Sequence, residues 1–196
     1  MAYIGMRKPV AAPVTSHTDG SAITYGTGFV IGNAVAANIN FDVNDNPDYG
    51  DDIMIDNDTG ISGYSGDIDV NMLTATVRAN LLGWDAVQNT ATPPATTHYQ
   101  VSDETTPEMG WGFIHVGMYK GVRSYEAYWF HKARFTQNNI AASTKKKQIE
   151  WNHPKLNFTG EGAYIDDSGK AKFFDWMSFE SESAAWTWLK AKAGIT

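Results

Sequence analysis

Two alternating runs that meet at a two-residue turn constrain the fold more than any other feature of the sequence. Residues 111–119 and 122–135 flank the dipeptide Lys120-Gly121, and glycine at the second position of such a turn is typical of a β-hairpin. In the second run Trp129 makes one alternating face apolar and Tyr128 the other. We therefore expect both faces to be covered, one by the core and one by a neighbouring subunit.

A third alternating run covers residues 29–43. A break or bulge is expected near Gly32-Asn33, because the run exceeds the usual length of a strand. Further strand character is expected over 145–158. A hairpin is expected over 163–176, turning at 166–169. Residues 85–109 are predicted to be a loop with one short strand.

Two helices are expected. The first begins at Asn71 as N-cap and ends at Gly83, with an apolar face formed by Leu73, Val77 and Leu81. The second runs from about Ser181 to Ala193. Its apolar face carries Ala185, Trp188 and Leu189.

Two segments lack such periodicity. Residues 1–26 are rich in small residues, proline and glycine, and they predict an extended N-terminal arm. Residues 42–66 are polar and acidic around the apolar group Ile53-Met54-Ile55, and they predict a long acidic loop or a protruding hairpin.

The pattern as a whole predicts an α+β fold that is mainly β. Its expected architecture is a β-sandwich or partial barrel with a flanking helix, a C-terminal helix and long loop extensions. A length of 196 residues favours a single domain over 1–196.

The composition and motifs of the sequence argue against several classes of protein. The chain has no cysteine, which excludes disulfides, thiolate metal sites and a thiol nucleophile. No apolar stretch is long enough for a membrane span, and the N-terminus does not have the pattern of a secretory signal. No Gly-x-Ser-x-Gly motif or phosphate-binding glycine loop is present, so we expect no enzyme activity.

Charge is distributed unevenly along the chain. The net charge is −7, and between Pro9 and Tyr119 the basic residue Arg78 stands against 14 acidic residues. From Lys120 onward 12 basic residues face 8 acidic ones. The acidic front argues against a duplex-binding surface. The asymmetry is that of a molecule whose opposite ends attract each other's copies, as head-to-tail assembly requires.

Histidine and the acidic segment provide the candidate metal ligands. Three histidines fall in expected strands, but none has a zinc-type spacing; the five are His17, His98, His115, His131 and His153. Residues 42–47 match the calcium-binding linker of cadherins. That linker, however, closes a domain of about 100 residues, and here it stands near the start. We expect the acidic residues to solvate the segment, and no metal or cofactor to be required.

Aromatic residues suggest a second use for the fold. A carbohydrate-stacking surface would use Tyr125, Tyr128, Trp129, Phe130, Trp176, Trp186 and Trp188. The alternative function is therefore a secreted carbohydrate- or calcium-binding β-sandwich module. Their alternation favours core and subunit interface instead.

Five segments, taken in order, resemble the major tail proteins of bacteriophages with long flexible tails, those of Gram-positive hosts in particular. The stretch Thr92 to Thr97 does not align with that pattern. The segments are 2–9, Asn44-Asp45-Asn46-Pro47 with Asp51-Asp52, 77–83, 121–132 and 149–151.

The resemblance implies a tail tube protein that assembles into stacked hexameric rings and encloses a channel for the genome. It implies a location in the virion tail after assembly in the host cytoplasm, with no membrane. The implied partners are further copies of the chain, the tape measure protein, the tail terminator and the distal tail proteins. DNA would pass the lumen without specific binding, because an acidic wall repels phosphates.

Within this resemblance the 42–66 segment is expected to join one ring to the next. The expectation rests on its length, its charge and its embedded apolar group. The expected inter-ring residues are Asp45, Asp48, Asp51, Asp52, Ile53, Met54 and Ile55.

Overall fold

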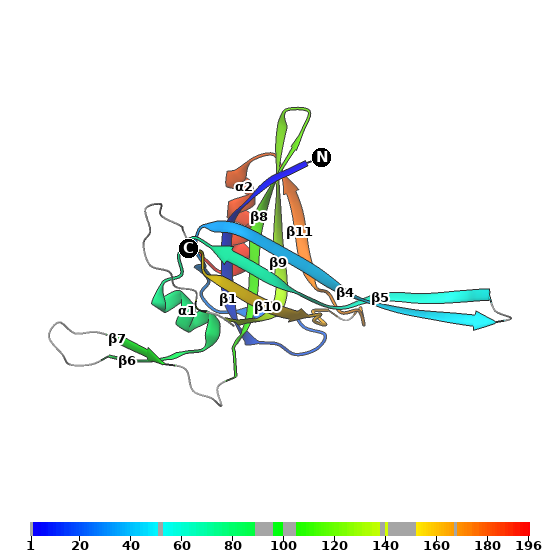
Figure 1. Ribbon diagram of the computed structural model, residues 1–196, viewed down its shortest axis with the longest axis horizontal. Coiled ribbons are helices and arrows are strands. Elements are labelled where there is room, and N and C mark those ends of the chain that lie inside the picture. The colour runs from blue at the N-terminus through cyan, green and yellow to red at the C-terminus, as the bar shows by residue number, and fades with distance from the viewer. Residues whose placement is uncertain are drawn as a thin grey trace.

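The computed structural model describes residues 2–50, 53–88, 96–99, 105–137, 140, 152–166 and 168–196. Within these residues, nine strands form one antiparallel sheet of main order β2-β1-β8-β9-β10-β5-β4, and β3 pairs with β1 and β11 with β9 (Figure 1). Strands β6 and β7 form a separate pair. The elements are β1 (Ala2–Ser16), β2 (Thr24–Tyr25), β3 (Phe29–Val30), β4 (Ala34–Gly50), β5 (Ile53–Val70), α1 (Ala75–Leu82), β6 (Asp85–Gln88), β7 (Thr96–Tyr99), β8 (Glu108–Tyr119), β9 (Val122–Thr136), β10 (Lys155–Glu161), β11 (Phe174–Phe179) and α2 (Glu182–Ala193).

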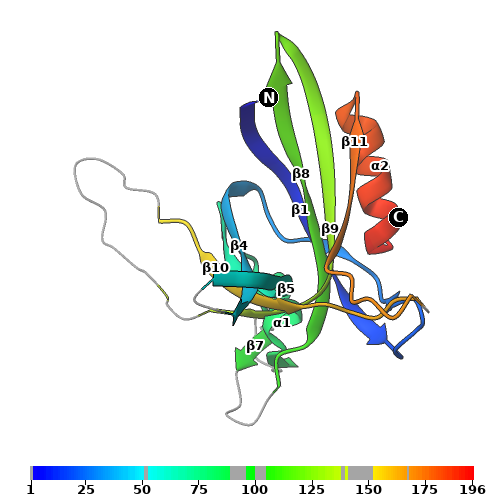
Figure 2. The same ribbon diagram turned by 90° about the vertical axis from the view of Figure 1, so that its right-hand side faces the viewer.

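Strand β9 is the one on which the sheet divides. One of its edges pairs with β8, and the other pairs first with β11 over residues 125–130 and then with β10 over 133–136. Figure 2 shows the consequence: β11 continues beside β8 and β9, whereas β10, β5 and β4 cross them. Two branches of one sheet therefore face each other across part of the molecule.

The turn between β8 and β9 has the predicted form. Lys120 and Gly121 have φ values of 47° and 81°. Positive φ at both central residues defines the type I′ turn, whose twist matches that of the flanking strands. The predicted hairpin is confirmed.

The expected N-terminal arm is instead largely a strand of the sheet. Strand β1 pairs with β8 from Ala2 to Pro13, on the edge opposite β9. Pro9 is accommodated because the register shifts between Arg7 and Val10, beside Lys8 at φ 51°. Such a bulge tolerates a residue without an N–H group.

Aromatic side chains fill the space between the two branches. Trp111 of β8 is fully buried and stacks on Phe130 with ring centroids 4.9 Å apart. It also lies 4.6 Å from the ring of Phe158 in β10. Tyr64 of β5 completes the cluster and donates its hydroxyl to the carbonyl of Lys132 at 2.9 Å. Each such burial contributes about 1.5–3 kcal/mol.

Helix α2 covers the other face of β9. Its bounds, Glu182–Ala193, agree with the predicted helix, and Ser181 caps its first turn while Gly194, at φ 64°, ends it. Ala185 and Leu189 are fully buried against Trp129 and its neighbours. The chain's own helix, and not a neighbouring subunit, therefore covers this second apolar face.

The first helix begins later than predicted. Thr74, not Asn71, is its N-cap, and the Thr74 hydroxyl accepts from Val77 N at 3.3 Å. The Asn71 side chain instead accepts from Asn33 N at 3.2 Å and ties two loops together. Gly83 ends the helix in the left-handed conformation, as predicted.

Residues 42–66 take the hairpin alternative. Strands β4 and β5 pair along most of their length, with register shifts after Asp42 and Asp48. The expected break near Gly32-Asn33 is confirmed, since β3 ends at Val30 and β4 begins at Ala34.

The fold class is mainly β with two helices, as expected, but the sheet does not close. Among the described residues the outer strands β2 and β4 do not pair with each other.

The expected hairpin over 163–176 is reduced to one bridge, Ala163 with Lys172, because β11 pairs with β9 instead. Of the expected 145–158 strand, residues 155–158 belong to β10, and residues 145–151 lie outside the described residues. Residues 85–109 hold two short strands, not one.

The contact between Tyr64 and Gly160 generates a prediction. A Cβ at position 160 would lie inside the van der Waals radius of the Tyr64 ring. Gly160→Ala is expected to lower the free energy of unfolding by about 1–3 kcal/mol, as overpacked cores do. Urea unfolding followed by circular dichroism measures this change.

Gly60→Ala is the matched control, because a Cβ there would meet nothing within 4 Å. It is expected to change stability by no more than about 0.5 kcal/mol. Equal stability of the two variants would contradict the packing described for Tyr64.

Candidate assembly surfaces

The β4–β5 hairpin extends well beyond the body of the sheet. Strand β10 pairs with β5 over residues 63–69. From there to Ile53, β5 continues with β4 as a two-stranded ribbon (Figure 1). Ten residues of strand span about 33 Å at 3.3 Å per residue. We call residues 42–50 and 53–62 the ribbon.

The ribbon exposes apolar side chains that have no core to enter. Ile53 and Ile55 are each 69% exposed, and Met54 is 54% exposed. Val43 and Ile61, which oppose each other in the register, are also exposed. A two-stranded ribbon is marginally stable alone in water. An apolar group at its end marks a surface for interaction.

The structure places the expected inter-ring residues as follows. Asp45 is exposed in β4, and Ile53, Met54 and Ile55 begin β5. For Asp48 only the backbone, in β4, is described. Asp51 and Asp52 lie outside the described residues. Those described are therefore brought together on one ribbon.

An apolar groove lies where the two branches of the sheet diverge. Its volume is about 410 Å³. Strands far apart in the sequence supply its walls, and for that reason no local pattern predicted it; one local signal was the apolar second face of β9. Residues from five strands line it, including Met6, Phe41, Phe113, His115, Tyr128 and Phe174.

A buried carboxylate lies beside this groove. Glu126 is 8% exposed, and one of its oxygens accepts from Tyr3 at 3.0 Å and from Tyr128 at 2.9 Å. The hydrogen bond to Glu126 raises the pKa of Tyr3, whereas burial is the main cause that raises the pKa of Tyr128. Tyr3 also stacks on His115 at 3.9 Å. Burial lowers the pKa of His115.

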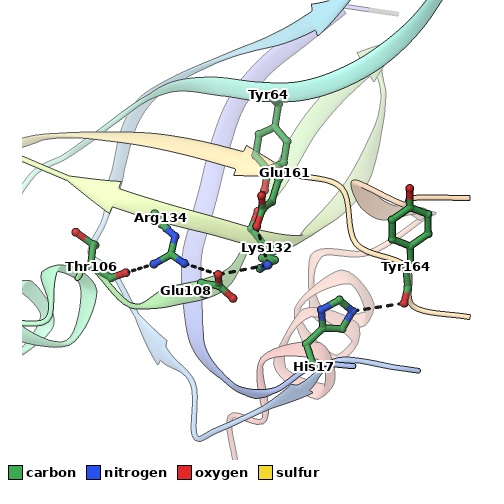
Figure 3. A network of polar contacts seen from close by, with 8 residues as sticks. All are labelled: His17, Tyr64, Thr106, Glu108, Lys132, Arg134, Glu161 and Tyr164. Carbon is green, nitrogen blue, oxygen red and sulfur yellow. Dashed lines mark hydrogen bonds and ion pairs between the residues drawn. The ribbon is translucent and has the colours of Figure 1, made fainter. Parts of the chain in front are cut away.

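A charged network joins β8, β9 and β10 (Figure 3). Lys132 lies between Glu108 at 3.3 Å and Glu161 at 2.6 Å. Arg134 also pairs with Glu108 and donates to the carbonyl of Thr106 at 2.6 Å. Each carboxylate thus faces a cation, and the network fastens the strands together.

A second cluster fastens α2 to the sheet. His131 is buried, and its Nε2 lies 3.3 Å from Oδ1 of Asp175 in β11. Lys192 of α2 reaches the other oxygen of Asp175 at 2.6 Å. The His131 imidazole first, and Lys192 with it, holds the pKa of Asp175 well below its usual range, against the opposing effect of partial burial.

The candidate metal ligands are dispersed. Among the described residues no three His, Asp or Glu side chains are placed to hold one ion. His115 stacks on Tyr3, His131 faces Asp175, and His17 lies 3.4 Å from the carbonyl of Tyr164. The cadherin-like residues 42–47 form part of β4, where successive side chains point to opposite faces and do not surround one ion.

The aromatic residues considered for carbohydrate stacking do not share one surface. Trp129 and Phe130 are buried. Tyr128 and Trp176 stack at 6.3 Å on the groove side of the sheet. Tyr125 of β9 and Trp186 and Trp188 of α2 are partly buried against the apolar cluster between this helix and the sheet, on the opposite side.

No family model matches the chain, and no curated protein is similar to it in sequence. Within the described residues no helix has the length and apolar character of a membrane span. Functional inference therefore rests on the surfaces described above.

The Asp175 cluster generates a prediction about pH. The folded-state pKa of Asp175 lies below the unfolded value of about 3.9, so its stabilising contribution is present above about pH 4 and is lost as pH falls. Asp175→Asn is expected to cost about 1–3 kcal/mol at pH 7. Its unfolding free energy is expected to change less between pH 6 and pH 3 than that of the wild type.

Thermal and urea unfolding at several pH values measure both effects. The exposed Asp19→Asn serves as a control and is expected to follow the wild type within about 0.5 kcal/mol. Parallel pH profiles for wild type and Asp175→Asn would show that the cluster contributes nothing.

Proposed function

We propose that this chain is the building block of a phage tail tube, a structural virion protein that forms hexameric rings stacked into a channel for genome delivery. Tape measure, terminator and distal tail proteins are its proposed partners. The proposal combines the sequence resemblance with the assembly surfaces.

The ribbon is the observation that carries the proposal. It extends about 33 Å from the body at the rise of a strand. It ends in three exposed apolar residues, Ile53, Met54 and Ile55. A module acting alone has no use for such an extension, since exposed apolar ends invite aggregation. A subunit that bridges to the next ring would bury this apolar end against its neighbour.

The open sheet supports lateral assembly. Strand β4 pairs with β5 on one edge, and β11 pairs with β9 on one edge; within the described residues their outer edges are unpaired. Unpaired edges are templates for strands of another chain. Pairing around a ring would satisfy both edges of every copy.

Acidity supports the passage of DNA. The net charge is −7, and the segment before Lys120 is strongly acidic. Proteins that hold DNA displace counterions with lysine and arginine. An acidic wall does the reverse, and the genome would move along it without adhering.

Shortening the ribbon tests the proposal. Residues 44–60 are replaced by Asn-Gly, which joins the register partners Val43 and Ile61 by a two-residue turn. The variant is expected to fold, because every residue of the aromatic core remains. It is expected to form no tubes in negative-stain electron microscopy, whereas the wild type does.

A point variant separates the apolar tip from the length of the ribbon. Ile53→Asp with Ile55→Asp is expected to abolish tubes at unchanged circular dichroism. Ile140→Asp, at a residue 75% exposed outside the ribbon, is the matched control and is expected to assemble normally. Normal tubes from the shortened and the Ile53/Ile55 variants would refute a bridging role.

A further inference from the structure

The turn between β8 and β9 carries a second exposed surface. Tyr119 is 57% exposed and Val122 is 70% exposed, on either side of the turn. The first residues of β1 pair with this end of β8 and add Ile4, which is also exposed. We call Ile4 and residues 119–123 the turn patch.

The turn patch is basic. Lys120 lies over the Tyr119 ring, with Nζ 5.4 Å from its centroid. Arg123 follows three residues later, opposite Met118 in the register. Among the described residues no carboxylate forms an ion pair with Lys120 or Arg123. Two cations beside exposed apolar side chains therefore face solvent.

The tip of the ribbon has the complementary chemistry. Its apolar residues lie within a sequence that has no lysine or arginine between Pro9 and Val77. The register places Asp48 directly opposite Asp56. Residues 42–62 contain seven aspartates and no lysine or arginine. Cations of another molecule would be attracted to this acidic sequence.

The two surfaces meet only between molecules. Figure 1 shows the β8–β9 turn at the top of the view and the ribbon projecting to the right, away from it. A contact between different patches on two copies is heterologous, and such a contact repeats from copy to copy. It therefore propagates along an assembly axis.

The groove fits the tip less well. Its lining contains aromatic and aliphatic residues but no lysine or arginine. The buried carboxylate of Glu126 lies beside it, hydrogen-bonded to the lining residue Tyr128. In the groove an acidic tip would find no cation and would lie near another negative charge. Charge complementarity therefore favours the turn patch over the groove as the docking site.

We propose that the ribbon tip of one copy docks on the turn patch of the next, with Ile53, Met54 and Ile55 against Tyr119 and Val122 and the acidic ribbon against Lys120 and Arg123. This inference rests on the proposed function, since it names the surface that receives the bridging ribbon.

Cysteine cross-linking tests the contact directly, because the chain has no cysteine of its own. The full-length double variant Met54→Cys/Val122→Cys is oxidised at concentrations where the wild type assembles. A ladder of cross-linked multimers is expected on a non-reducing gel. Met54→Cys/Met72→Cys is the matched control, since Met72 is 63% exposed but lies outside the patch, and it is expected to give no ladder.

Charge reversal provides the second arm. Lys120→Glu with Arg123→Glu is expected to lower multimer yield about tenfold, because like charges across an interface disfavour association. Mixing that protein with Asp48→Lys/Asp56→Lys is expected to restore cross-links, each protein also carrying Met54→Cys/Val122→Cys. Added salt is expected to weaken the wild-type contact.

The outcomes separate the two proposals. The turn patch is overturned as receptor if the wild type forms tubes but Met54→Cys/Val122→Cys gives no ladder. It is also overturned if charge reversal does not lower the multimer yield. In either case the proposed tube function stands. Absence of both tubes and ladder overturns both. A ladder equal to that of the Met72 control also overturns the specific contact.

Discussion

The stacking of Trp111 against Phe130 and Phe158 is the interaction on which the rest of the structure depends. These rings come from β8, β9 and β10, and they close the space where the sheet divides. Tyr64 brings β5 into the same cluster and fits over Gly160, where no larger residue has room. Because this packing fixes β5 at its C-terminal half, the N-terminal half leaves the body as a ribbon in a defined direction. The position of the candidate bridging segment is thus a consequence of the aromatic core.

Both faces of β9 are covered within one chain, and this changes where assembly contacts are sought. The doubly apolar pattern of residues 122–135 suggested a neighbour on one face, but α2 occupies it, held by its apolar side and by the Asp175 cluster. In the described part of the chain, the surfaces available to the proposed neighbouring copies are the unpaired strand edges, the ribbon and the turn patch. Their chemistry is asymmetric, acidic at one and basic at another, and this asymmetry favours a repeating contact over a closed pair.

Local signals predicted the elements that local chemistry determines. Lys120-Gly121 predicted the turn because both residues must adopt positive φ, and Gly83 predicted the end of α1 because glycine readily adopts the left-handed conformation of a C-cap. Local signals could not predict which segments far apart in the sequence pair with each other. Residues 1–26 look like an arm because Pro9 and Pro13 disrupt the alternation, yet β8 provides a partner edge about 100 residues away, and a bulge accommodates Pro9. The groove draws on five strands, and the apolar second face of β9 was the one local signal for it. Asn71 and Thr74 are both good caps, and only the contact with Asn33 decides between them.

The central claim is that copies of this chain assemble through surfaces built into the monomer fold. Electron microscopy of the purified wild-type protein over a range of concentrations tests it most directly. The expected result is hollow tubes or stacked rings with sixfold symmetry, whose side-on images repeat at one regular axial spacing. A protein that remains a monodisperse monomer at every concentration, in the microscope and in sedimentation, would contradict the account.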